Sequence, residues 1–133
     1  MNPVFLVTVG LVALWNVSDQ WHLAADQAFA QVLAWRQPII TTTFVMLECG
    51  NAAARRPFRS KVCRLRETLD RRNELFVPTE DDWKQAWADY EQGKAGQAGI
   101  VYHVSFVVMR RLGITEAFTN DRHFQAAGFT TLF

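Results

Sequence analysis

The sequence predicts an α/β fold in which helices cover a mostly parallel sheet of four to five strands. Short apolar stretches typical of buried strands alternate with longer stretches of helical periodicity. No internal repeat, low-complexity tract or linker interrupts this alternation. The chain has 133 residues, half of them hydrophobic, which is enough to build one buried core. We therefore expect a single domain over residues 1–133.

The first half of the chain is expected to contain two strands and four helices. An apolar stripe at helical spacing runs through 23–36, and Pro57 separates two later helices. The expected elements are a strand at 4–7, a helix at 10–15, a helix at 23–36, a strand at 38–41, a helix at 43–54 and a helix at 60–72.

The second half begins with an expected strand at 75–77 and a helix that Thr79 caps. Asp82 lies three residues after Thr79, as a capping box requires. One face of this helix carries Trp83, Trp87 and Tyr90, and we expect this aromatic stripe in the core.

A glycine-rich loop at 93–99 precedes the most apolar helix, expected at 100–112 and ended by Gly113. We expect this helix to be the central buried one. The remaining expected elements are a strand at 115–119, a helix at 121–127 and a strand at 129–132.

The composition limits the cellular compartment and the binding partners that we expect. The net charge of +1 excludes a polycation that binds nucleic acid or membrane over its whole surface. Cys49 and Cys63 are too few for a disulfide framework, so we expect free thiols in the core of a cytoplasmic protein. The apolar opening at 3–15 lacks a basic flank and is shorter than the roughly 20 residues of a membrane span. We expect no membrane partner.

Two carboxylates stand out. Ligands of parallel sheets bind at the carboxyl ends of strands, and Asp121 directly follows an expected strand. Its alternative role is to cap the next helix. Glu48 lies in an apolar helix, where a carboxylate is costly unless it faces a site or a partner. Two carboxylates in one cleft would indicate a divalent metal ion.

Three segments together resemble PIN domains of the VapC toxin type. They are FLVTVGLVAL with SDQWH at 5–22, LECGN at 47–51, and VSFVVMRRLGITEAFTNDRHF with AGF at 104–129. The resemblance extends over essentially the whole chain. It implies a PIN-like three-layer α/β/α fold and a metal-dependent endoribonuclease.

In that family about four carboxylates hold Mg2+ or Mn2+, which polarises the scissile phosphate and activates water. The resemblance assigns Glu48 and Asp121 as catalytic and metal-binding residues. Val7 and Tyr102 stand at the two other carboxylate positions. We therefore expect weak or absent metal binding and impaired catalysis. Because the neighbouring motif residues remain, we interpret the two differences as selective inactivation.

Four further residues are expected beside the carboxylates: Thr8, Asn120, His103 and His123. The two histidines raise the alternative of a rebuilt transition-metal site with Glu48 and Asp121. We favour a packing role, because His103 points about 100° away from Tyr102 around the helix.

Charge is distributed unevenly along the chain. Residues 55–72 contain eight basic residues against two acidic ones, a net charge of +6, whereas residues 74–91 contain six acids against one lysine, a net charge of −5. The basic stretch suits an RNA backbone or an acidic partner, and its alternative is a solvated helix face. The residues expected to bind are Arg55, Arg56, Arg59, Lys61, Arg64 and Arg66.

Two functions remain open. The first is a VapC-like toxin with impaired ribonuclease activity. The second is a pseudo-nuclease that binds RNA or an antitoxin without cutting. The resemblance also implies a cognate antitoxin and a homodimer.

Overall fold

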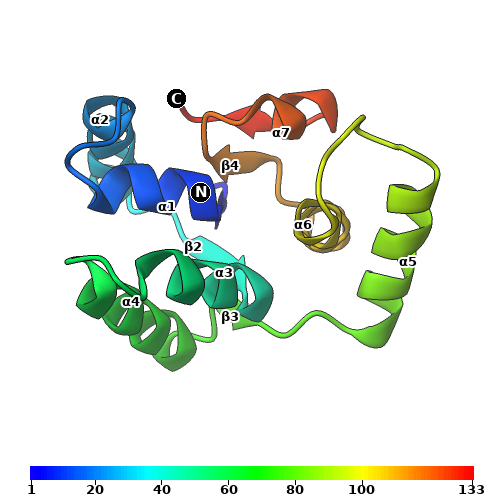
Figure 1. The fold of residues 1–133 in the computed structure, drawn as a ribbon, viewed down its shortest axis with the longest axis horizontal. Coiled ribbons are helices and arrows are strands. Elements are labelled where there is room, and N and C mark those ends of the chain that lie inside the picture. The colour runs from blue at the N-terminus through cyan, green and yellow to red at the C-terminus, as the bar shows by residue number, and fades with distance from the viewer.

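A five-stranded sheet forms the centre of the molecule in the computed structural model, which describes residues 1–133 (Figure 1). The strand order is β3-β2-β1-β4-β5, and every neighbouring pair is parallel. The α/β fold class is confirmed. The strands are β1 (Val4–Leu6), β2 (Ile39–Thr42), β3 (Leu75–Phe76), β4 (Glu116–Phe118) and β5 (Thr130–Thr131).

Helices connect the strands and complete a three-layer α/β/α arrangement. None of them is both long and apolar enough to cross a membrane. The helices are α1 (Thr8–Trp15), α2 (His22–Ala34), α3 (Thr43–Ala53), α4 (Arg59–Arg71), α5 (Glu80–Glu91), α6 (Ile100–Leu112) and α7 (Arg122–Ala126).

Helix α1 begins at Thr8, two residues earlier than the sequence predicts. Val7 is the N-cap residue, and its carbonyl accepts a hydrogen bond from the Leu11 amide at 3.0 Å. Gly10 therefore lies inside the helix. A Cβ there would overlap the backbone carbonyl of Phe118, so glycine permits α1 to approach the end of β4 closely.

The hydrophobic core surrounds the sheet, with buried residues from the helices on it and a large share from α6. All three residues of β1 are fully buried, and α6 buries six of its 13 residues, which confirms it as the central helix. Phe106 of α6 packs against Phe124 and Phe129, with ring centroids 4.8 and 5.6 Å away. This aromatic cluster fixes α6 against the chain that follows β4.

Helix α5 is fixed to α6 by its first turn. The capping box is confirmed: Thr79 Oγ1 accepts from the Asp82 amide at 3.1 Å, and Asp82 Oδ2 accepts from the Thr79 amide at 2.9 Å. The same carboxylate accepts two hydrogen bonds from Arg111 of α6, at 2.9 and 2.7 Å. A buried carboxylate is thus fully paired where the two helices meet.

The expectation that the aromatic stripe of α5 lies in the core is wrong. Trp83, Trp87 and Tyr90 are 43%, 48% and 47% exposed. Figure 1 shows α5 at the outer edge of the molecule, beyond α6. The helix turns Ala86 and Asp89 inward instead, because it packs mainly on α6.

The two thiols differ. Cys49 is buried, as expected, whereas Cys63 is exposed on α4. The expectation of a core position is wrong for Cys63, because α4 buries Val62 and Leu69 and turns Cys63 to solvent.

Candidate functional site

The candidate site lies where the strand order reverses at β1. In open α/β sheets, ligands bind outside the carboxyl ends of the strands at such a point. The end of β1 leads directly into Thr8, and the end of β4 leads within three residues to Asp121. Glu48 projects from the second turn of α3, which follows β2. The topology therefore brings both predicted carboxylates to one edge of the sheet.

Glu48 is held by a hydroxyl group. Thr8 Oγ1 donates to Glu48 Oε1 at 2.9 Å, because α1 and α3 begin beside each other and pack together. The neighbouring Cys49 is buried, and burial raises the pKa of its thiol to about 12, although a hydrogen bond with Thr8 opposes the rise. Cys49 is therefore a neutral thiol near neutral pH and supplies no anionic ligand.

Asp121 has partners on both oxygens. Its Oδ1 accepts from the backbone amide of His123 at 2.9 Å and lies 2.8 Å from His123 Nδ1. Its Oδ2 accepts from the Tyr102 hydroxyl at 2.6 Å. The carboxylate therefore caps α7, the alternative that the sequence left open, and at the same time accepts a hydrogen bond from Tyr102 of α6.

Protonation states follow from these contacts. Burial alone would raise the pKa of Asp121, but the hydrogen bonds from Tyr102 and His123 outweigh it and bring the pKa below its usual value. Burial raises the pKa of Tyr102 well above its usual value, and the hydrogen bond to Asp121 raises it further. At neutral pH a protonated phenol therefore donates to an ionised carboxylate.

Val7 and Tyr102, which the resemblance places at carboxylate positions, both lie in packed surroundings. Val7 is 1% exposed and belongs to the hydrophobic core. Tyr102 packs edge-on against Phe124, with ring centroids 5.0 Å apart. Together with Glu48, Tyr102 lines a hollow of about 360 Å³ beside the start of α6.

These residues do not fit a protein-bound Mg2+ or Mn2+ ion. No three His, Cys, Asp or Glu side chains lie together as a metal site requires. One oxygen of each carboxylate already accepts a hydroxyl hydrogen bond, from Thr8 or Tyr102. Mg2+ requires near-octahedral oxygen coordination, and neither valine nor a protonated tyrosine is a suitable ligand.

Comparison with known proteins gives a structural relative. No protein-family model and no curated protein matches the chain. Among solved structures, VapC20 of Mycobacterium tuberculosis, a sarcin-ricin loop cleaving toxin, matches with a TM-score of 0.76. The sequences are 28% identical, and the match covers 96% of each chain. The chain therefore has a PIN-like fold and resembles VapC-type toxins.

The four residues expected beside the carboxylates behave differently from one another. Thr8 and His123 contact a carboxylate, whereas Asn120 forms no side-chain hydrogen bond. His103 is 2% exposed and packs edge-on against Tyr90 of α5, so it faces away from Asp121. The structure does not bring the two histidines together with the carboxylates.

The basic stretch lies on the α3–α4 turn and along α4. All six cations expected to bind RNA or a partner are exposed, and none forms an ion pair. Helix α4 buries Val62 and Leu69 on its opposite face. Its positive charge is therefore directed to solvent.

Sequence reasoning missed two features of the molecule. It treated Tyr102 as the loss of a ligand and did not predict its hydrogen bond to Asp121. A phenol at a position expected to face a carboxylate was the available signal. It also treated Trp15 only as the end of a helix, although Trp15 lines a pocket with Arg56 and Lys61.

Proposed function

We propose that this chain is a VapC-like PIN-domain protein that binds RNA and has lost most or all of the metal-dependent endoribonuclease activity implied by the resemblance. The observation that carries the proposal is the 2.6 Å hydrogen bond from the Tyr102 hydroxyl to Asp121, with Val7 buried beside the site. A neutral hydroxyl and an apolar side chain stand where two further carboxylates would be needed.

The argument for lost catalysis is one of ligand number. With four carboxylates a divalent ion would be held in a pocket of strong negative charge, but two carboxylates remain and both accept hydrogen bonds. Losing residues that merely orient metal ligands lowers metal affinity or activity by about 10- to 100-fold. Losing two ligand positions should lower both further.

The argument for RNA binding is independent of the metal. The exposed cations of α4 and the preceding turn are unpaired, and their charge is unaffected by Val7 or Tyr102. Lysine and arginine contacts to phosphates provide most of the affinity for nucleic acid without sequence recognition. The known cleavage target of VapC20 makes a sarcin-ricin loop hairpin a suitable first probe.

The same unpaired cations would also suit an acidic protein, so a non-catalytic role in binding a cognate antitoxin is the second candidate function. The homodimer, the antitoxin and the cytoplasmic location remain predictions from the resemblance. Light scattering of the purified chain tests the dimer: we expect about twice the monomer mass of 15.2 kDa.

The proposed function is tested with the purified chain and two fluorescent RNAs, the sarcin-ricin hairpin and a ten-residue oligouridylate. Anisotropy should show binding that weakens steeply with salt. Gels should show no cleavage with Mn2+ above that in EDTA. Mn2+-dependent cleavage by this chain would overturn the impairment. Absence of binding to both RNAs at low salt would overturn RNA binding and leave the antitoxin role.

A further inference from the structure

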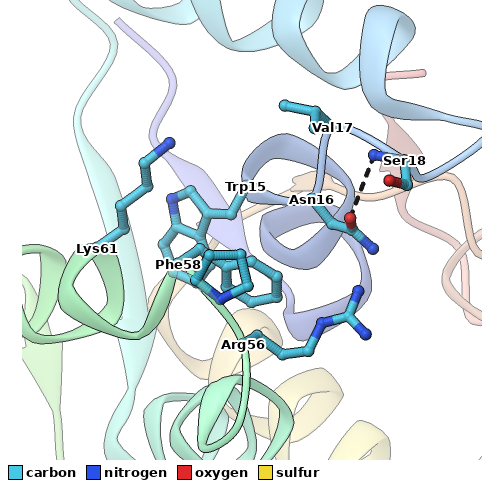
Figure 2. A pocket seen from close by; sticks show the side chains of 8 residues that line it. Trp15, Asn16, Val17, Ser18, Arg56, Phe58 and Lys61 are labelled. Atoms are coloured by element: carbon cyan, nitrogen blue, oxygen red, sulfur yellow. Dashed lines mark hydrogen bonds between the residues drawn. The ribbon is translucent and has the colours of Figure 1, made fainter.

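A second pocket, at the other end of α1 from the carboxylates, combines aromatic rings with cations. Its volume is about 320 Å³, and none of its lining residues is acidic. Figure 2 shows Lys61 and Arg56 on opposite sides of the Trp15 and Phe58 rings. The lining residues are Trp15, Asn16, Val17, Ser18, Arg56, Pro57, Phe58 and Lys61.

The pocket is connected to the carboxylate site by two helices that pack together. Helix α1 begins with Thr8 at the carboxylate site and ends with Trp15 at the pocket. Helix α3 carries Glu48 and leads into the turn with Arg56. Seven residues of helix rise span about 10 Å. About three nucleotides of a stacked strand cover that distance, at roughly 3.4 Å each.

The rings offer a surface for a flat ligand. Trp15 and Phe58 lie with centroids 6.2 Å apart at an angle of 31°. Phe58 is only 4% exposed, whereas Trp15 is partly exposed. Trp15 is therefore the ring that a ligand can reach, and Phe58 supports it from the interior. Any purine or pyrimidine base can stack on such a ring, because every base has a flat π face.

The polar groups suit the rest of a nucleotide. The Arg56 guanidinium lies 5.8 Å from the Phe58 ring centroid and forms no ion pair, and Lys61 is likewise unpaired. Asn16 Oδ1 accepts from the Ser18 amide at 3.2 Å, which leaves the Asn16 amide nitrogen free to donate. A nucleotide within a strand has a phosphate on each side, matching cations on both sides of the rings.

We propose that this pocket binds one nucleotide of single-stranded RNA, with the base on Trp15 and the flanking phosphates at Arg56 and Lys61. The proposal rests on the proposed RNA binding and assigns it a specific contact. An acidic peptide would satisfy the two cations but would leave the exposed face of Trp15 without a flat partner. The combination of ring and cations favours RNA.

The experiment measures anisotropy of the full chain with ten-residue oligouridylate and with an abasic ribose-phosphate strand of equal length. Trp15→Leu should weaken oligouridylate binding by about 5- to 100-fold, the effect of one lost base stack, without changing the salt slope. Arg56→Gln with Lys61→Gln should lower the slope of log K against log salt by about 1.4. Trp35→Leu, at an exposed tryptophan on the C-cap of α2, is the matched control for Trp15→Leu.

The abasic strand provides a test that does not depend on the stability of the variant. Wild-type protein should bind it more weakly than oligouridylate, and Trp15→Leu should reduce that difference, as coupled changes do in a double-mutant cycle. A ten-residue oligoglutamate should compete poorly. Equal competition by the peptide, or an unchanged difference between the two strands in Trp15→Leu, would overturn the nucleotide pocket while RNA binding stands. Failure of wild-type protein to bind oligouridylate would overturn both proposals.

Discussion

The packed helices α1 and α3 have a carboxylate site at one end and a cationic pocket at the other, and the two differ in how easily substitutions abolish their function. At the strand end, Glu48 and Asp121 accept hydrogen bonds from Thr8 and Tyr102. At the far end, Arg56 forms no ion pair and is exposed beside Trp15. The same two helices thus connect a site with satisfied carboxylates to a surface with unsatisfied cations.

This difference has a physical origin. A protein-bound metal ion needs several ligands at once, so residues that act as a unit lose function together when one or two are changed. Phosphate contacts on a surface contribute one by one, each with a similar salt dependence. Two substitutions can therefore abolish cleavage and leave RNA binding nearly intact.

The largest expected effect comes from restoring both carboxylates. Val7→Asp with Tyr102→Asp should lower the free energy of unfolding without metal by about 4 kcal/mol, because buried charges would lie close together without partners. Mn2+ at about 100 times its Kd should recover about 2.7 kcal/mol. Denaturant unfolding with and without Mn2+ measures both effects.

The matched control for this variant is Val7→Asn with Tyr102→Asn, which keeps size and polarity but adds no charge. Mn2+ should stabilise neither this control nor the wild-type protein. An equal Mn2+ stabilisation of wild-type protein would show that the present residues already form a metal site.

A smaller effect is expected from Tyr102→Phe, which removes only the hydroxyl that donates to Asp121. A hydrogen bond to a charged group contributes about 1.5 kcal/mol or more, so stability at pH 7 should fall by about that amount. The hydrogen bond also helps to lower the folded-state pKa of Asp121. The wild-type advantage should therefore be complete above about pH 4, near the unfolded pKa, and disappear as pH falls through the lower folded pKa.

Tyr90→Phe is the matched control, because Tyr90 is 47% exposed and its hydroxyl forms no hydrogen bond. Its unfolding curves should match those of wild-type protein at every pH. A Tyr102→Phe variant that behaves like this control would show that the Tyr102 hydroxyl does not stabilise ionised Asp121.

The sequence was sufficient for features that depend on local spacing. The capping box of Thr79 with Asp82, the buried helix at 100–112 and the positions of Glu48 and Asp121 after their strands all follow from such spacing. These features need only helix periodicity, capping chemistry and the geometry of parallel strands.

Features that depend on distant neighbours could not be predicted. Helical periodicity placed Trp83 and Trp87 on one face but could not show that α5 packs on α6 through another face. Trp15 and Arg56 are 41 positions apart, and only the packing of α1 against α3 brings them to one pocket. The bond from Tyr102 to Asp121 likewise joins two separate elements.

The smallest expected effect on stability concerns the basic face. Arg64→Ala with Arg66→Ala should change the free energy of unfolding by less than about 0.5 kcal/mol, because both side chains are exposed and unpaired. The slope of log K for oligouridylate against log salt should fall by about 1.4 if each contacts one phosphate.

Lys84→Ala with Lys94→Ala removes the same charge elsewhere. Both lysines are paired with carboxylates, Glu80 at 3.0 Å and Asp89 at 3.3 Å, so this control should leave the salt slope unchanged. An equal change in the salt slope of both double variants would show that RNA binding depends on net charge and not on the exposed cations of α4.

The central claim is that catalysis was lost at positions 7 and 102 while RNA binding remained. The most direct measurement is Mn2+-dependent cleavage of the sarcin-ricin hairpin and oligouridylate by wild-type protein, each single reversion and the Val7→Asp, Tyr102→Asp double variant. We predict no cleavage by wild-type protein, little by either single variant and EDTA-sensitive cleavage by the double variant, because the ligands act as one unit. A folded, Mn2+-loaded double variant that binds both RNAs and cuts neither would contradict the account.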